Sequence, residues 1–225
     1  MSVKKLFLIL LVIFVSGCVC STAPRLSPRK IAQVSHAEDA GQLILIGATG
    51  NSDAILSFYA KAGGEWKEVF STHAYIGKNG LGKTREGDGK TPEGVFHFTK
   101  AFGIAPDPGC ALGYVQVDDS HYWIGDSASP RYNQFVSTRD YDGFSKKDSE
   151  HIIEYAKPYQ YCLNISYNEE GIPGAGSAIF LHCYSNNPYT GGCVAIPEQD
   201  MKHLMQIVRP GCKIVISSLE KLEKY

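Results

Sequence analysis

Short apolar runs separated by glycine-rich turns occupy the chain from Gln42 onward, and this pattern restricts the possible fold more than any other feature. The runs are brief and rich in β-branched and aromatic residues; they include LILIGA, AILSFYA, EWKEVF, GVFHF, YVQV and HYWIG. Brief runs of this composition between turn residues favour strands over helices. The sequence therefore predicts a domain built mainly from β-strands.

One helix is predicted near the C-terminal end, between residues 197 and 208. Its apolar residues recur at helical spacing: Met201, Leu204, Met205 and Val208. A proline at the first turn, followed by acidic residues, favours the start of a helix at this point. A last strand is predicted over residues 212 to 217.

Two other segments read as loops. The segment from Gly77 to Gly94 is glycine-rich but lacks the spacing of a phosphate-binding loop, so we interpret it as a series of hairpin turns. Residues 127 to 160 are polar and aromatic, with weak strand patterning. Long connections of this kind usually act as lids or binding loops, and we expect this one to form a wall facing the substrate.

Charge is balanced along the 225 residues, with 22 Lys and Arg against 23 Asp and Glu and a formal net charge of −1. Basic and acidic residues are interspersed, which gives no electrostatic footprint for a phosphate backbone. We therefore predict no nucleic-acid partner. Length and composition favour one globular domain and leave its oligomeric state open.

The N-terminal residues differ in kind from the rest. Lys4 and Lys5 precede ten apolar residues, Leu6 to Val15, which would rise only about 15 Å as a helix and fall short of a roughly 30 Å hydrocarbon core. We predict a signal segment at residues 1–17, with a flexible tether at 18–41. The letters VSGC resemble the lipobox of bacterial lipoproteins, which implies lipidation of Cys18 and an extracytoplasmic, membrane-anchored protein. Plain secretion and an uncleaved anchor remain alternatives.

Seven cysteines in a chain predicted to be exported raise the question of disulfides. Setting aside Cys18 and Cys193 leaves an odd number, so at least one thiol stays free or pairs elsewhere. A bond between Cys183 and Cys193 stays open, as does a reduced and buried state.

His182 and Cys193 are the candidate reactive residues. The run SAIFLHC predicts a buried strand ending near His182, and Cys193 follows a polar loop just before the predicted helix. A histidine beside a cysteine can take its proton and lower the pKa of the thiol. Gly191 and Gly192 can adopt positive φ, and the Gly192 and Cys193 amides could then hold an oxyanion. Inert structural roles for both reactive residues remain open.

A zinc site is a weaker alternative. It would recruit His182, Cys183, Cys193 and Cys212, but the chain has no pair of cysteines at the short spacing typical of zinc ligands there.

TGGCVAIP behind an upstream FLHC resembles the signature of the L,D-transpeptidase (YkuD-like) family, a histidine followed after a loop by Ser/Thr-His-Gly-Cys. Further blocks resemble a divergent branch of that family; they are KTPEGVFHF, SPRYNQF, SEHI, IPGAGSAIFLH and GGCVAIPEQDM. The resemblance implies a single catalytic domain over residues 42–220, a mainly β, sandwich-like fold with one or two short helices.

The same resemblance implies cysteine-dependent acyl transfer on peptidoglycan stem peptides, in cell-wall biogenesis and cell shape. Cys193 would form the acyl-enzyme, and His182 would be the base, its other ring nitrogen held by a backbone carbonyl. An amine on a neighbouring stem would complete a 3→3 cross-link. No metal and no organic cofactor is implied. A hydrolase with the same nucleophile and a catalytically dead wall-binding module are the alternatives.

Two residues depart from the family pattern. Gly191 replaces the second histidine of the signature, and Ala195 replaces an arginine that many members carry. Loss of that arginine removes a bidentate binder of carboxylates. The basic residues considered as substitutes are Arg131, Arg139 and Lys146, and the residues predicted to bind substrate are Thr190, Tyr132 and His151.

Overall fold

The structure is a computed structural model, and it describes residues 40–222. The predicted signal segment, the lipidation site at Cys18 and most of the predicted tether lie outside the described residues. Within residues 40–222, no helix is both long and apolar enough to cross a bilayer.

Strands dominate the described part of the chain, which confirms the predicted mainly β class. The strands are β1 (Gln42–Ala48), β2 (Asp53–Ala62), β3 (Glu65–Tyr75), β4 (Gly94–Gly103), β5 (Tyr114–Gln116), β6 (His121–Trp123), β7 (Phe135–Ser137), β8 (Glu150–His151), β9 (Cys162–Ile165), β10 (Phe180–Cys183), β11 (Val194–Ile196) and β12 (Lys213–Ser218). The described helices are α2 (Glu198–Ile207) and α3 (Leu219–Leu222), with 3-10 turns η1 (Lys146–Asp148), η2 (Ile152–Glu154) and η3 (Pro158–Gln160).

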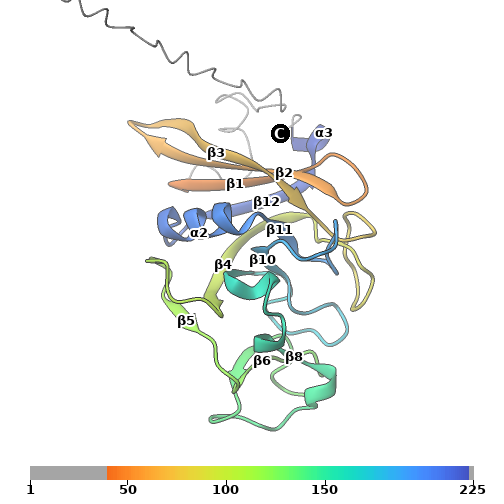
Figure 1. Ribbon diagram of the computed structural model, residues 1–225. Coiled ribbons are helices and arrows are strands. Elements are labelled where there is room, and N and C mark those ends of the chain that lie inside the picture. The colour runs from red at the N-terminus through yellow and green to blue at the C-terminus, as the bar shows by residue number, and fades with distance from the viewer. Residues whose placement is uncertain (1–39, 223–225) are drawn as a thin grey trace, which may run out of the picture.

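Nine strands form one sheet in the order β12-β1-β2-β3-β11-β10-β9-β4-β5. The first half of β4 also pairs with β12, while its second half pairs with β9. The sheet therefore folds back on itself and encloses the main core, to which Phe58, Leu163 and Leu181 contribute from three different strands. This closure gives the facing layers expected of a sandwich-like fold (Figure 1).

The predicted helix and last strand are confirmed, as α2 and β12, with their ends shifted by one residue. Met201, Leu204 and Met205 are buried in the main core, because their spacing places them on one side of the helix. α2 follows β11 directly, so the helix begins two residues after the strand that the Cys193 loop enters.

The segment predicted as an irregular connection carries more structure than expected. β7 and β8 within it both pair with β6 to form a second, three-stranded sheet. Figure 1 shows this small sheet at the opposite end of the molecule from β1, β2 and β3. Strands of two or three residues contain too few side chains to show an alternating pattern, so the sequence does not reveal them.

Candidate functional site

The parallel pairing of β10 with β11 brings the two candidate reactive residues to one place. It sets Leu181 beside Val194 and His182 beside Ala195, so Cys193 enters the sheet next to the start of β10. His182 and Cys193 both line a cavity of about 340 Å³. Its other lining residues are Lys83, Glu86, Gly87, Glu150, Tyr155, Pro158, Tyr159, Ser177, Ala178, Ile179, Ser185, Asn187, Tyr189, Thr190, Gly191 and Gly192.

The backbone of residues 178–180 holds the Cys193 thiol. The Phe180 amide donates to Sγ at 3.3 Å, and Sγ donates to the Ala178 carbonyl at 3.1 Å. Only 8% of the Cys193 surface is exposed. The S–H must therefore turn away from the Ala178 carbonyl before an imidazole can accept its proton.

A left-handed backbone supports that carbonyl. Ala178 has φ 55°, an unusual value for a residue with a side chain. Its amide donates to Asn133 Oδ1 at 3.0 Å, and the same oxygen accepts a hydrogen bond from Trp123 Nε1 at 2.9 Å. Asn133 is itself left-handed, at φ 61°. These bonds fix the turn that carries the acceptor for the Cys193 thiol.

The ring of His182 is oriented as the resemblance implies. Nδ1 donates to the backbone carbonyl of Cys183 at 2.7 Å, which leaves Nε2 as the nitrogen able to accept a proton. The ring of Tyr159 lies edge-on to the imidazole, with 5.4 Å between centroids. His182 is therefore held in one orientation by a carbonyl and an aromatic neighbour.

Both reactive groups are neutral in the resting protein. Burial lowers the pKa of His182 to about 4. Burial, and next the negative charge of Glu150, raise the pKa of the Cys193 thiol to about 12, against the opposing effects of the Phe180 amide and of Lys83. The expectation of a depressed thiol pKa is therefore wrong for this state. Attack by sulfur must be coupled to transfer of its proton, because no thiolate is stored beforehand.

The two glycines before Cys193 differ, contrary to the prediction that both adopt positive φ. Gly192 has φ 149°, and a Cβ there would lie 2.8 Å from the Lys90 carbonyl oxygen. Gly191 has no such φ, and a Cβ there would meet nothing within 4 Å. The Gly192 amide donates to Thr190 Oγ1 at 3.1 Å, so it is not free to hold an oxyanion as predicted. The amide of Cys193 remains the predicted donor.

Two threonine hydroxyls position the nucleophile from its carbonyl side. Thr190 Oγ1 donates to the Cys193 carbonyl at 2.7 Å, and Thr91 Oγ1 donates to the same oxygen at 3.2 Å. The Gly77 amide in turn donates to Thr91 Oγ1 at 2.8 Å. Thr190 lines the cavity, but its hydroxyl is used inside the protein, which makes it a positioning residue rather than a direct substrate contact.

Two residues predicted to bind substrate lie away from the cavity lining. Tyr132 is buried, and its hydroxyl donates to Glu86 and accepts from the Gly176 amide, so it supports the wall from behind. His151 stacks on Tyr122, with 4.3 Å between ring centroids, and belongs to the small sheet. Direct substrate contact by these two residues is therefore not supported.

The basic residues considered as replacements for the missing arginine also lie outside the lining. Arg131 stacks over the ring of Tyr141, while Arg139 and Lys146 pair with aspartates. Lys83, which sequence reasoning did not single out, is the lysine that lines the cavity. Its position within the glycine-rich segment, interpreted as turns alone, concealed it.

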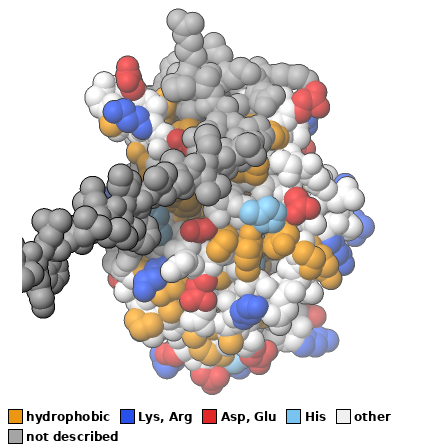
Figure 2. All heavy atoms as spheres, turned by 45° about the horizontal axis from the view of Figure 1, so that its top comes forward, with side chains coloured by type: hydrophobic (Ala, Val, Ile, Leu, Met, Phe, Trp, Pro, Cys, Tyr) orange, Lys and Arg blue, Asp and Glu red, His pale blue; other side chains and the backbone are white. Residues whose placement is uncertain are grey.

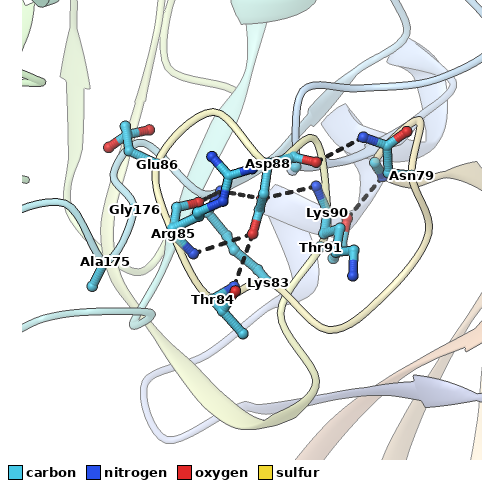
Figure 3. Close-up of polar contacts among 12 residues, drawn as sticks. Asn79, Lys83, Thr84, Arg85, Glu86, Asp88, Lys90, Thr91, Ala175 and Gly176 are labelled. Atoms are coloured by element: carbon cyan, nitrogen blue, oxygen red, sulfur yellow. Dashed lines mark hydrogen bonds and ion pairs between the residues drawn. The ribbon is translucent and has the colours of Figure 1, made fainter.

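Lys83 forms a buried ion pair with Asp88. The Nζ to Oδ1 distance is 3.1 Å, and the side chains are only 2% and 6% exposed. The Asp88 carboxylate also accepts from the amides of Thr84, Arg85 and Lys90, as Figure 3 shows. Although burial opposes ionisation, these hydrogen bonds hold the pKa of Asp88 well below its usual range. The charge of Lys83 is thus largely balanced within the wall.

Glu150 is the second functional candidate that sequence reasoning missed. It precedes His151 in the recognised block SEHI, and adjacent residues of a strand point in opposite directions, so the glutamate reaches the cavity while the histidine does not. Tyr159 Oη donates to Glu150 Oε2 at 2.8 Å. Burial raises the pKa of Glu150 to about 7, against the hydrogen bond from Tyr159 and with a further contribution from the charge of Glu86.

The cysteines of the described chain are reduced: Cys110, Cys162, Cys183, Cys193 and Cys212 are free and buried. Cys183 Sγ faces the Tyr161 carbonyl at 3.7 Å rather than bonding to Cys193. Within residues 40–222, no three side chains of His, Cys, Asp or Glu come together in a group that could hold a metal ion.

A family model described as the L,D-transpeptidase catalytic domain matches residues 52–216. A comparison with curated proteins finds no match. Among solved structures, Bdellovibrio bacteriovorus Bd1075 is similar at 16% identity and a TM-score of 0.43, covering 83% of this chain and 53% of its own.

Two further structures are similar to this chain. The helical cell shape determining protein Pgp2 from Campylobacter jejuni shares 14% identity at a TM-score of 0.48, covering 84% of this chain and 54% of its own. An L,D-transpeptidase from Stackebrandtia nassauensis shares 14% identity at a TM-score of 0.35, with coverage of 84% and 63%. The chain thus spans about half the length of the first structures it matches.

Proposed function

This chain belongs to the L,D-transpeptidase catalytic domain family, and from that premise we propose that it joins peptidoglycan stem peptides through an acyl-enzyme on Cys193. The observation that carries the proposal is the shared cavity of Cys193 and His182, in which the imidazole presents Nε2 as a base. A thiol and an oriented imidazole facing one cavity are the requirements of nucleophilic acyl transfer.

The first half of the reaction follows from this arrangement. His182 Nε2 takes the thiol proton as Sγ attacks the carbonyl carbon of the donor peptide bond. The C–N bond then breaks, and the leaving amine receives the proton from His182. The product is a thioester on Cys193 with a neutral imidazole beside it. The Cys193 amide is the proposed donor to the oxyanion that forms between the two events.

In the second half, an amine on a neighbouring stem attacks the thioester and forms the 3→3 cross-link. We also propose that the chain works outside the cytoplasm on a lipid anchor. Support for that location comes only from the sequence around Cys18, which lies outside the described residues.

The test is mass spectrometry of tetrapeptide-containing muropeptides incubated with the protein. Cys193→Ala should abolish the cross-linked dimers, while Cys212→Ala, which removes another buried free thiol, should not. Cys193-dependent loss of the terminal residue without dimers would instead identify a hydrolase. An unchanged muropeptide pattern with folded protein would contradict the proposal and favour a binding module.

A further inference from the structure

Glu150 occupies the cavity wall beside the two proposed reactive residues. Its Oε2 accepts a hydrogen bond from Tyr159 Oη at 2.8 Å, and the ring of Tyr159 packs edge-on against His182. Glu150 also lies close enough to Cys193 for its charge to oppose ionisation of the thiol. Carboxylate, tyrosine, imidazole and thiol therefore form one connected group around the cavity.

Of the residues that line the cavity, Lys83, Glu86 and Glu150 carry charge, and they differ in how far that charge is committed. Lys83 is paired with Asp88 inside the wall. Glu86 Oε2 is held by hydrogen bonds from the hydroxyls of Tyr132 and Ser177. Glu150 receives one hydrogen bond, from Tyr159, at one of its two oxygens. Its carboxylate is the group with capacity left for a cationic ligand.

The proposed reaction requires such a group in its second half. An aliphatic amine has a pKa near 10, so it enters the cavity at neutral pH as an ammonium ion, which cannot attack a thioester. His182 is a poor base for this ion, because burial lowers its pKa to about 4. Burial raises the pKa of Glu150 to about 7, which makes its carboxylate the stronger base of the two.

We propose that Glu150 binds the ammonium group of the acceptor and accepts its surplus proton, which directs the acyl group to an amine rather than to water. This inference rests on the proposed function and specifies its acceptor site. Glu150 would then be a catalytic residue of the second half-reaction, with Tyr159 positioning its carboxylate.

The step balances as follows. One proton passes from the ammonium to the Glu150 carboxylate, and the freed nitrogen lone pair forms a bond to the thioester carbon. The C–S bond breaks, and a second proton leaves the nitrogen through His182 to restore the Cys193 thiol. The third hydrogen stays on the new amide. Glu150 returns its proton to water before the next cycle.

The experiment compares Glu150→Gln with the wild type on tetrapeptide muropeptides. Intact-protein mass spectrometry follows the acyl-Cys193 adduct, and product analysis gives the ratio of cross-linked dimer to hydrolysed tripeptide. We expect the adduct to form in the variant while this ratio falls at least about tenfold, given the 10²- to 10⁴-fold range typical of a general base. Glu154→Gln, a change to an exposed glutamate outside the lining, should leave the ratio unchanged.

A second acceptor separates base catalysis from a structural role. Hydroxylamine is uncharged at neutral pH and needs no base to become nucleophilic, so Glu150→Gln should transfer the acyl group to it as well as the wild type does. Tyr159→Phe, which keeps the carboxylate but removes its hydrogen bond, should lower the dimer ratio less than Glu150→Gln.

Three results would overturn the inference: an unchanged ratio in Glu150→Gln, an equal loss with hydroxylamine, or an equal loss in the Glu154→Gln control. Absence of the acyl-Cys193 adduct in the wild type would overturn the proposed function and this inference with it. An adduct that forms normally while the ratio stays constant would remove only the role of Glu150.

Discussion

Replacing Gly192 with alanine should destabilise the protein far more than the same change at Gly191. Gly192 has φ 149°, a conformation that costs a residue with a side chain about 1–3 kcal/mol. The new Cβ would also lie 2.8 Å from the Lys90 carbonyl oxygen and 3.2 Å from Ile179 Cδ1, and such overpacking costs about 1–3 kcal/mol more. We therefore expect Gly192→Ala to lower the free energy of unfolding by about 2–5 kcal/mol.

Gly191 provides the matched control, one residue away in the same loop. Its φ lies outside the left-handed region, and a Cβ would meet nothing within 4 Å. Gly191→Ala should therefore be neutral or stabilising by up to about 1 kcal/mol. Urea unfolding of both variants measures the difference. Equal stabilities would show that the loop relaxes freely, and that Gly192 does not fix the backbone before Cys193.

Three other changes test the surroundings of the site. Ala178→Gly should leave stability unchanged or raise it by about 1 kcal/mol, because φ 55° disfavours alanine; a loss above about 1 kcal/mol in urea unfolding would contradict this. Asn133→Ala should cost about 2–4 kcal/mol, because it strands the buried donors of Trp123 and Ala178, and a thermal shift within error of the wild type would refute that reasoning. His182 has a folded pKa of about 4, below its ordinary value near 6.5, so the unfolded chain binds its proton first and stability falls as pH drops through this window. That loss amounts to about 3 kcal/mol in total, and His182→Gln should remove it from the pH dependence of unfolding; an unaltered dependence would show that the imidazole is not buried.

The repeating elements of the fold could be predicted from the sequence, because their patterns are local. Met201, Leu204 and Met205 fall on one helical face, and they pack into the core as that spacing requires. The approach of His182 to Cys193 could be predicted only from the family signature. It depends on the pairing of β10 with β11, which no local pattern specifies.

The charged wall of the cavity could not be predicted from the sequence. Lys83 lies among glycines whose turn character dominates the segment, and its burial depends on Asp88 folding back across five residues. Glu150 and His151 are neighbours in a two-residue strand, too short for a pattern to show which of them faces inward. Choosing the histidine was reasonable from residue chemistry, but the orientation of β8 decides in favour of the glutamate.

The double pairing of β4 also governs how this protein can meet other chains. An unpaired outer strand exposes a row of amide and carbonyl groups on which a foreign strand can be added, and this is a common route to aggregation. Because β12 pairs with both β1 and β4, the large sheet ends in an open edge only at β5, which is three residues long. So short an edge offers little template for strand addition. The large sheet can therefore carry extended apolar strands with little exposure to edge-to-edge association.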